Sequence, residues 1–245
     1  MAACAAEWLI GLINFQVNDT APIVIADTLI HLLSLGSTSL VHNNAVLQAT
    51  SIGLSEDATA TVPQMTALAA LPEFAHFGLN GHTLTVMDSG RHLAAYTANA
   101  GATPTAVQMI GDATLTAAQA NAIAALSTDT GDNLLTVSDT PAALLDEANA
   151  GGIALASALT LSGNATVSAS QATVLFGNAS FNTGGHHLTI QGPATPLLSL
   201  SATIDADATT LALEANETVS VATLLGLTQL GIKFSLNGHT LTVAD

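Results

Sequence analysis

The chain has 245 residues, of which 49% are hydrophobic and only 3% aromatic, so its core must be built from Leu, Val, Ile and Ala. Two basic residues, Arg91 and Lys233, stand against 18 acidic ones and give a formal charge of −16. Clustered Lys and Arg supply phosphate binding, so this balance argues strongly against a nucleic-acid partner and disfavours an anionic membrane. The apolar stretch from Trp8 to Phe15 is too short to span a bilayer, and we expect no membrane insertion.

In chain order, the first predicted elements are a helix over Ala5 to Leu12 and a strand over Ile23 to Ala26. Later segments predict strands, for example Met109 to Leu115 and Leu155 to Leu161. Helices are predicted where Leu and Ile recur on one face of an Ala-rich stretch, and the last two copies are richer in Val, Thr and Gly and therefore weaker. These predicted helices cover Gln64 to Leu71, Ala117 to Leu126, Ser170 to Phe176 and Val221 to Leu230.

One heptapeptide occurs twice, at residues 80–86 and 237–243, as Asn-Gly-His-Thr-Leu-Thr-Val. Asn-Gly favours a turn, and the alternation of Thr with Leu and Val that follows predicts a half-buried strand. Weaker copies occur at Leu135 to Asp139 and at Leu188 to Gly192. The chain is therefore a repeat protein.

The spacing of the copies gives the period. The strand copies end at residues separated by 61, 51, 53 and 53 positions, namely Asp27, Asp88, Asp139, Gly192 and Asp245. A second set, Val62, Leu115, Val167 and Val219, is separated by 53, 52 and 52 positions. Two independent sets with one period of about 53 indicate tandem units. The longer first interval predicts an insertion between Gly36 and Asp57.

These units predict an α/β or β-rich solenoid with parallel strands stacked in rungs of about 26 residues. We expect a single elongated repeat domain over residues 1–245, with units at about 1–27 (partial), 28–88, 89–139, 140–192 and 193–245. A Leu five residues after each strand end is expected to face inward, at Leu32, Leu93, Leu144 and Leu197. Two inward ladders are expected, Ile23/Leu84/Leu135/Leu188/Leu241 and Ile25/Val86/Val137/Ile190/Val243, and one outward ladder, Val24/Thr85/Thr136/Thr189/Thr242.

Two phrases carry a family resemblance. Residues 139–145, Asp-Thr-Pro-Ala-Ala-Leu-Leu, and residues 113–120, Ala-Thr-Leu-Thr-Ala-Ala-Gln-Ala, resemble the "DTAANL" and "LTAAQ" phrases of Ala/Thr-rich tandem repeats in very large bacterial secreted surface proteins, often exported by type I secretion. The resemblance implies an extracellular, structural or adhesive role. The calcium-binding Gly-Gly-x-Gly-x-Asp nonapeptide that often accompanies such repeats is absent, so the resemblance does not imply dependence on calcium.

Histidines and carboxylates are the candidates for site chemistry. His82, His186, His187 and His239 lack the second-ligand spacing of a zinc site, so a structural or exposed role is the favoured interpretation. The strand-end residues Asp27, Asp88, Asp139 and Asp245 could line a row of calcium ions, but one Asp per unit is too few, and capping of the following turn is favoured. The adjacent pairs Glu56-Asp57 and Asp146-Glu147 do not face each other across a cleft, and nucleophile motifs are absent. We therefore expect no catalytic residues, no metal or cofactor site and no enzyme activity.

The resulting hypothesis is a non-enzymatic extracellular protein, a building block of a surface filament, surface layer or adhesin stalk that stacks head to tail. Self-association is expected because the last strand, ending at Asp245, has no polar cap in the sequence. An excerpt of a longer repeat chain would account for the same feature. The alternative from another class is a carbohydrate-binding or carbohydrate-cleaving parallel β-helix, whose partner would be a cell-surface glycan.

Overall fold

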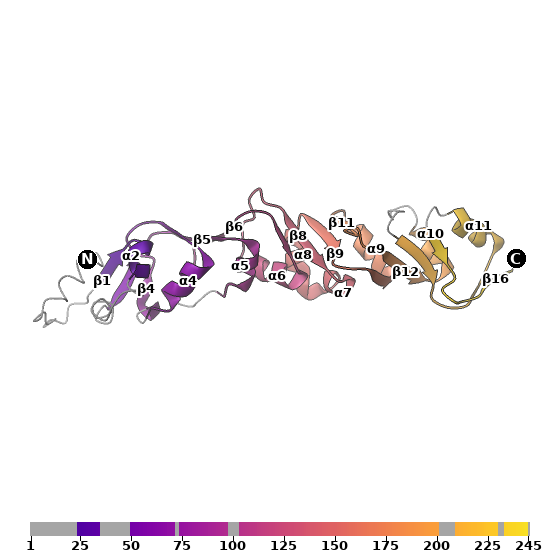
Figure 1. Cartoon of the computed structure of the whole chain (residues 1–245), viewed down its shortest axis with the longest axis horizontal. Coiled ribbons are helices and arrows are strands. Elements are labelled where there is room, and N and C mark those ends of the chain that lie inside the picture. Colours follow the sequence, from indigo (N-terminus) through magenta and orange to yellow (C-terminus); the bar gives the residue numbers. More distant parts are fainter. Residues whose placement is uncertain are drawn as a thin grey trace, which may run out of the picture. The chain divides into compact units, whose positions relative to one another are not determined.

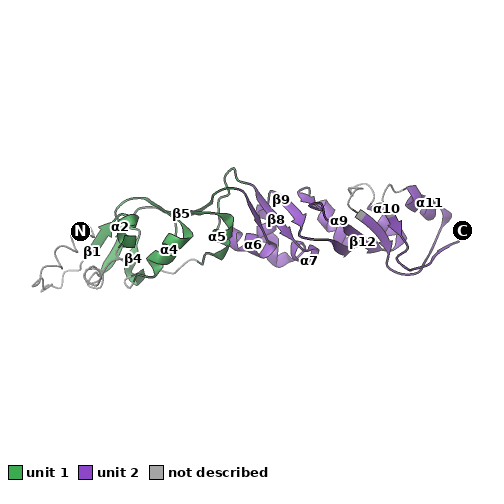
Figure 2. Cartoon of the chain, viewed as in Figure 1, with its two compact units in different colours: residues 1–111, 126–133 green, residues 112–125, 134–245 purple. Residues whose placement is uncertain are grey.

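The structure is a computed structural model that describes residues 24–34, 50–71, 74–97, 103–200, 209–229 and 233–244. The predicted helix from Ala5 to Leu12, Ile23, Asp245 and residues 36–49 of the expected insertion lie outside this range. The described chain is mixed α/β, and every strand pairing in it is parallel. Contacts divide the chain into unit 1, residues 1–111 and 126–133, and unit 2, residues 112–125 and 134–245 (Figure 2).

Unit 1 contains, among its described residues, two three-stranded sheets with the orders β1-β2-β4 and β3-β5-β6. Figure 1 labels β1 and β4 of the first sheet and β5 and β6 of the second. The last strand of the second sheet is extended by a parallel bridge between Gln108 and Asp129. The elements of unit 1 are β1 (Val24–Asp27), α2 (Leu29–Ser34), β2 (Ser51–Leu54), β3 (Ala58–Ala60), α4 (Val62–Ala69), the 3-10 helix η1 (Phe74–His76), β4 (Phe77–Gly78), β5 (Leu84–Asp88), α5 (Gly90–Ala95) and β6 (Ala106–Met109).

Unit 2 contains, in its described part, sheets with the orders β11-β9-β8-β7, β10-β12-β13-β15 and β14-β16. Its elements are β7 (Ala113–Leu115), α6 (Ala117–Ala125), β8 (Leu135–Asp139), α7 (Pro141–Leu144), the 3-10 helix η2 (Glu147–Asn149), α8 (Ala150–Leu155), β9 (Ala158–Leu161), β10 (Ala165–Ser168), α9 (Ala169–Gly177), β11 (Phe181–Asn182), β12 (Leu188–Gly192), α10 (Ala194–Ser199), β13 (Thr209–Leu213), β14 (Glu217–Val219), α11 (Val221–Gln229), β15 (Lys233–Ser235) and β16 (Leu241–Val243).

The period is built from half-repeats, each a first strand, a turn, a second strand and a helix. In a type A half-repeat the first strand is the longer or equal one, as in β2/β3, β9/β10 and β13/β14. In a type B half-repeat the first strand is very short and the second is the repeated heptapeptide or its equivalent, as in β4/β5 and β11/β12. The sequence prediction of strand, helix, strand, helix per unit missed these short first strands.

Successive half-repeats pair with a sideways step, which corrects the expected ladders. In unit 2, β12 pairs with the first strand of the next half-repeat, so that Leu188 lies opposite Thr209. The second strand of that half-repeat begins at Glu217, further along the chain, and Glu217 lies opposite Leu241. One full period, from Leu188 to Leu241, thus consists of three steps: the pairing of Leu188 with Thr209, the passage along the chain from Thr209 to Glu217, and the pairing of Glu217 with Leu241.

Leu84, Leu135, Leu188 and Leu241 consequently lie in four different sheets, and the prediction that like positions stack directly on one another is wrong. Their orientation is as predicted, because the first three are fully buried. Each parallel pairing joins residues that lie about half a period apart in the sequence, in agreement with the predicted length of a rung. Outward positions pair in register as threonines: Thr59 with Thr85, Thr114 with Thr136, Thr166 with Thr189, and Thr218 with Thr242.

The turns follow from residues that tolerate a left-handed backbone. Asn80 and Asn237 have φ of 53° and 49°, and Gly131 and Gly184 occupy the same place in the other two copies with φ of 56° and 63°. This confirms the turn predicted from Asn-Gly. Gly111, with φ of 72°, breaks the strand predicted over Met109 to Leu115 into β6 and β7. Similarly, α8 ends at Leu155, so only the second half of the strand predicted over Leu155 to Leu161 forms.

The helices form where predicted, including the two weaker predictions, α9 and α11. In α4 and α9 a capping box satisfies the first amides, with Thr61 and Ser168 as N-cap residues. The Leu anchors five residues after the strand ends are buried as expected: Leu32, Leu93 and Leu197 are fully covered and Leu144 is 6% exposed. Among the described residues, no helix is long and apolar enough to cross a bilayer.

Candidate functional site

The aspartates that end the heptapeptide-type strands are the most regular polar feature of the chain. Asp88, at the end of β5, is 9% exposed, and its carboxylate accepts three hydrogen bonds. Oδ1 accepts from the amide of Ser89 at 2.7 Å and from Nδ1 of His92 at 2.8 Å, and Oδ2 accepts from the amide of Val62 at 2.9 Å. Ser89 precedes the first residue of α5, and Val62 is the first residue of α4. One side chain therefore joins the beginnings of two helices.

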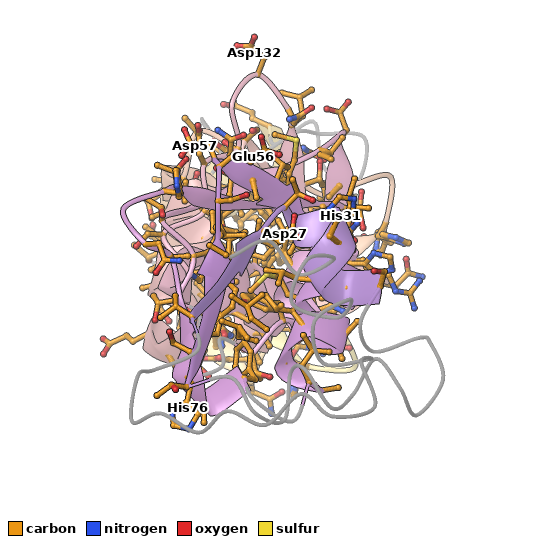
Figure 3. The ribbon with its side chains drawn as sticks, turned by 90° about the vertical axis from the view of Figure 1, so that its left-hand side faces the viewer. Asp27, His31, Glu56, Asp57, His76 and Asp132 are labelled. Atoms are coloured by element: carbon orange, nitrogen blue, oxygen red, sulfur yellow. The ribbon has the colours of Figure 1, made fainter. Side chains whose placement is uncertain are left out.

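The same arrangement recurs in the next copy. Asp139 accepts from the amide of Thr140 at 2.7 Å and from the amide of Ala117, the first residue of α6, at 2.9 Å. Asp27, which is 6% exposed, accepts from the amide of Thr28 and from Nδ1 of His31 (Figure 3). The interpretation of these aspartates as caps is confirmed for the three described copies, whereas Asp245 lies outside the described residues. The cap also reaches the preceding half-repeat, which the sequence analysis did not anticipate.

The fourth copy has no strand-end aspartate, because Gly192 occupies its place. The amide of Ala194, the first residue of α10, is instead bound by Oε2 of Glu217 at 2.8 Å, from the following half-repeat. Near Gly192 there is a hollow of about 300 Å³ whose lining is rich in hydroxyl groups. Its polar lining residues are Ser168, Ser170, Thr173, Gln191, Ser199 and Glu214.

A second row of side chains lies in the turn between the two strands of the type A half-repeats. Asp57 and Asp112 accept from the amides of Thr83 and Leu134, both at 2.8 Å. Asn164 and Asn216 occupy the same place in the later copies. They accept from the amides of His187 and Thr240 at 2.9 and 2.8 Å. Each bond spans 22 to 26 residues and ties one half-repeat to the next.

Sequence reasoning missed this second row, although its signal was present. Asp57, Asp112, Asn164 and Asn216 are separated by 55, 52 and 52 positions, which is the period already found for the strands. From the sequence, Asp57 stood out only as a member of the adjacent pair Glu56-Asp57. In the other adjacent pair, Asp146 caps the 3-10 helix η2 by accepting from the amide of Ala148.

The electrostatics of one member of each row, Asp88 and Asp57, favour the ionised carboxylate. Burial raises the pKa of Asp88, but hydrogen bonds from Val62, His92 and Ser89 outweigh it and hold the pKa below its ordinary value of 3.8. The amide of Thr83 lowers the pKa of Asp57 in the same way, with a smaller contribution from His82. Both groups therefore carry a negative charge at neutral pH and act as acceptors for amide hydrogens.

The candidate histidines are dispersed. His82 Nδ1 lies 3.7 Å from Asp57, and Nε2 of His187 lies 2.9 Å from the hydroxyl of Thr210. The backbone amides of His186 and His239 close turns by donating to Thr183 and Leu236. In the part of the chain that the structure describes, no three His, Cys, Asp or Glu residues lie close enough together to hold a metal ion.

The arrangement has one clear chemical capacity, which is to satisfy backbone amides between half-repeats. Asparagine side chains also satisfy backbone carbonyl groups across half-repeats. The carbonyls of Leu54, Met109 and Leu213 accept from the side chains of Asn80, Asn133 and Asn237. In comparisons with protein-family models, with curated proteins and with solved structures, nothing matches this chain.

Proposed function

We propose that this chain is a non-enzymatic structural repeat protein, a stalk or building block of a bacterial exterior in which the half-repeats continue as a solenoid. The observation that carries the proposal is the periodic use of polar side chains as ties between half-repeats. Asp57, Asp88, Asp112 and Asp139 each accept an amide from a half-repeat 22 to 26 residues away.

These ties suit a load-bearing role for a physical reason. A half-repeat of this size buries too little apolar surface to offset the conformational entropy of ordering its backbone, so its stability depends on its neighbours. Bonds to backbone amides at fixed intervals join neighbours at points where no ladder hydrogen bond forms. A pull on one half-repeat is thereby carried to the next by both sheet and side-chain bonds.

The exterior location is proposed from the residues that resemble secreted bacterial repeats and from the formal charge of −16. Dispersed negative charge keeps neighbouring repeats soluble and suppresses their random association. Antibody labelling of intact cells of the source organism tests this location, and signal only after the cells are opened would contradict it.

Single-molecule stretching tests the structural role. We expect unfolding to occur in discrete steps, and the release of one 53-residue period should lengthen the chain by roughly 190 Å at about 3.6 Å per residue. Variants lacking Asp88 or Asp139 should release their steps at lower force than the unmodified chain, whereas Glu56→Ala should not change the force. Smooth extension without steps would contradict a load-bearing role.

Glycan binding is the second candidate, and the hydroxyl-lined hollow beside Gly192 is the observation that favours it. Sugars are bound by hydroxyl and carboxylate groups of this kind, and Glu214 supplies a carboxylate to the lining. A glycan array tests this role. Specific retention that is lost in Thr173→Val would support it, and monodisperse protein without retention would favour the structural role.

A further inference from the structure

The pair Asn-Gly occurs twice in the chain, at Asn80-Gly81 and at Asn237-Gly238, and each pair begins one copy of the heptapeptide. The residue before each pair is also the same, so residues 79–86 and 236–243 both read Leu-Asn-Gly-His-Thr-Leu-Thr-Val. An asparagine that precedes glycine is chemically labile, because glycine has no side chain to hinder attack by its own amide nitrogen on the asparagine side chain. The chain therefore carries one reactive pair at two places.

The reaction needs no partner except water, and both pairs are exposed to solvent. The amide nitrogen of Gly81 attacks Cγ of Asn80, the bond from Cγ to Nδ2 breaks, and the proton of the attacking amide leaves with Nδ2 as ammonia. The product is a cyclic imide that joins the side chain to the backbone. Water then opens the imide at one of its two carbonyls, which leaves either aspartate or isoaspartate. Both products carry a carboxylate in place of the amide.

The folded turn keeps the reacting atoms apart. Asn80 and Gly81 have φ of 53° and 86°, and the amide of His82 donates to the carbonyl of Leu79 at 2.9 Å. These are the features of a type I′ turn, in which ψ of the first central residue is about 30°. Closing the imide ring requires Cβ of Asn80 and the nitrogen of Gly81 to be nearly eclipsed across the Cα–C bond, which this ψ does not allow.

The second pair is folded in the same way. Asn237 and Gly238 have φ of 49° and 81°, and the amide of His239 donates to the carbonyl of Leu236 at 2.8 Å. The turn must therefore open at either site before the reaction can proceed.

The side-chain amide of each asparagine is also held by the preceding half-repeat. Nδ2 of Asn80 donates to the carbonyl of Leu54 at 3.2 Å, and Nδ2 of Asn237 donates to the carbonyl of Leu213 at 3.3 Å. A Cβ on Gly53 would collide with Nδ2 of Asn80, so this glycine leaves the space that the amide occupies. Rotating the backbone to form the imide would pull the amide away from its acceptor.

Two other copies show that neither the turn nor the tie requires the pair Asn-Gly. Nδ2 of Asn133 donates to the carbonyl of Met109 at 2.9 Å, but the residue after Asn133 is Leu134. In the remaining copy the left-handed turn is built from Gly184 and Gly185, with φ of 63° and 81°. These copies supply matched controls within the same chain.

We propose that Asn80 and Asn237 are sites of spontaneous deamidation, that the folded turns hold the reaction back, and that its products break the ties of these side chains to the preceding half-repeat. The aspartate product places a carboxylate oxygen against the carbonyl of Leu54, and both groups are acceptors. Isoaspartate in addition lengthens the main chain by one carbon within the left-handed turn. A chain that opens and reacts is thereby marked permanently and cannot re-form the original contact.

The reaction rate of the folded chain measures how often the turn opens. An open turn reacts as an unfolded peptide does, so the ratio of the folded to the unfolded rate equals the population of open turns when closing is faster than reaction. The two octapeptides are identical, so their rates in the unfolded chain should be equal. A difference between the two sites in the folded chain then reports a difference in opening alone.

Peptide mapping by mass spectrometry tests the inference. The whole chain is incubated at mildly alkaline pH, either folded in buffer or unfolded in guanidinium chloride, and aspartate and isoaspartate are quantified at each asparagine. We expect equal rates at Asn80 and Asn237 in denaturant and rates at least about tenfold lower at both sites in buffer. Asn133 should react at least about tenfold more slowly than either site in denaturant, because Leu134 hinders the attack.

Variants at the first site test the effect of the product. Asn80→Asp carries the direct product, whereas Asn80→Gly reproduces the Gly-Gly turn of the copy at Gly184 and loses the tie without gaining a carboxylate. Asn80→Asp should raise the equilibrium constant for unfolding in urea by roughly threefold or more, and by more than Asn80→Gly does, because only the aspartate brings two acceptors together.

Three results would overturn the inference. Equal rates with and without denaturant would show that the turns do not protect the asparagines, and no reaction at either site in denaturant would show that they are not deamidation sites. An Asn80→Asp chain as stable as the unmodified one would show that the product does not break the tie. The rates are measured on the unmodified chain and stand even where a variant fails to fold. They also do not depend on the structural role proposed above, which the stretching experiment tests separately.

Discussion

Replacing Asp88 with alanine should destabilise the fold by about 2–4 kcal/mol, because a buried carboxylate that serves two helices is lost. The substitution removes the acceptor of the amide of Ser89, the N-cap residue of α5, and a hydrogen bond of this kind contributes roughly 0.5–1.5 kcal/mol net. The amide of Val62, a partly buried residue, also loses its acceptor, and an unsatisfied donor that water does not reach costs about 1–3 kcal/mol. The His92 side chain is 59% exposed, so water replaces its bond and it adds little.

Urea unfolding followed by circular dichroism measures the loss, and hydrogen exchange at the Val62 amide locates it. The control is Glu56→Ala, an exposed carboxylate for which a change within about 0.5 kcal/mol is expected. Asp88→Asn keeps one acceptor oxygen and should fall between the two. A loss below about 1 kcal/mol with unchanged exchange at Val62 would show that the tie between half-repeats is not stabilising.

Three further predictions rest on single observations. Tyr96 is 7% exposed, and its hydroxyl, alone among the buried side-chain polar atoms described, has no hydrogen-bond partner. Tyr96→Phe should therefore stabilise the fold by roughly 1 kcal/mol in thermal unfolding. A loss of stability would instead reveal that the hydroxyl is hydrogen-bonded. A Cβ on Gly152 would collide with the backbone of α6, so Gly152→Ala should cost about 1–3 kcal/mol in urea unfolding, whereas Gly163→Ala, where nothing lies within 4 Å, should be neutral. Folding depresses the pKa of Asp88 below 3.8. The stability that the ionised Asp88 carboxylate contributes is therefore complete above the pKa of the unfolded chain and is lost as the pH falls through the lower folded value. The difference in stability between the unmodified chain and Asp88→Ala should accordingly be constant from pH 7 to 5 and shrink below about pH 4.

Local features were predictable from sequence because local chemistry determines them. The turn at Asn80 requires a left-handed backbone, which Asn and Gly adopt most readily, and α7 begins at Pro141 after its cap Thr140, as Asp-Thr-Pro indicated. The buried Leu anchors were visible because they recur at one offset from the strand ends. The short strand β4, only Phe77–Gly78, could not be found because so short a strand shows no periodicity.

The pairing partners were not predictable in the same way. Like residues recur every 53 positions, and the assumption that like stacks on like placed Leu188 directly over Leu135. The structure instead places Leu188 opposite Ala165 and Thr209, residues with no resemblance to it. Which strand pairs with another depends on how the intervening helix and turn return the chain to the sheet. This geometry produces no recurring residue pattern in the sequence.

In the candidate site, too, the local hydrogen bonds were predictable from sequence and the bonds between half-repeats were not. The bonds of Asp88 and Asp139 to the amides of the N-cap residues that follow them, Ser89 and Thr140, follow from Asp before a helix start. The second bonds of these aspartates, to Val62 and Ala117, cross from one half-repeat to another and depend on the sideways step. A periodic polar residue at a turn, such as Asp112 or Asn216, can be found from sequence as a candidate, but its partner can be identified only once the pairing is known.

The sideways step makes the full sequence period, and not its half, the unit that can be removed. Deleting residues 140–192 joins Asp139 to Pro193, so β8 takes the place of β12 against β13, and Glu217 keeps its bond to the amide of Ala194. Deleting only residues 140–165 joins Asp139 to Thr166 inside β10, which leaves β8 without β9 and β10 without its first residue. We expect the first variant to unfold cooperatively within a few degrees of the unmodified chain and the second to lose cooperative unfolding in unit 2. Equal thermal stability of the two variants would mean that the half-repeats are interchangeable, and the staggered pairing could then not be what organises the sheets.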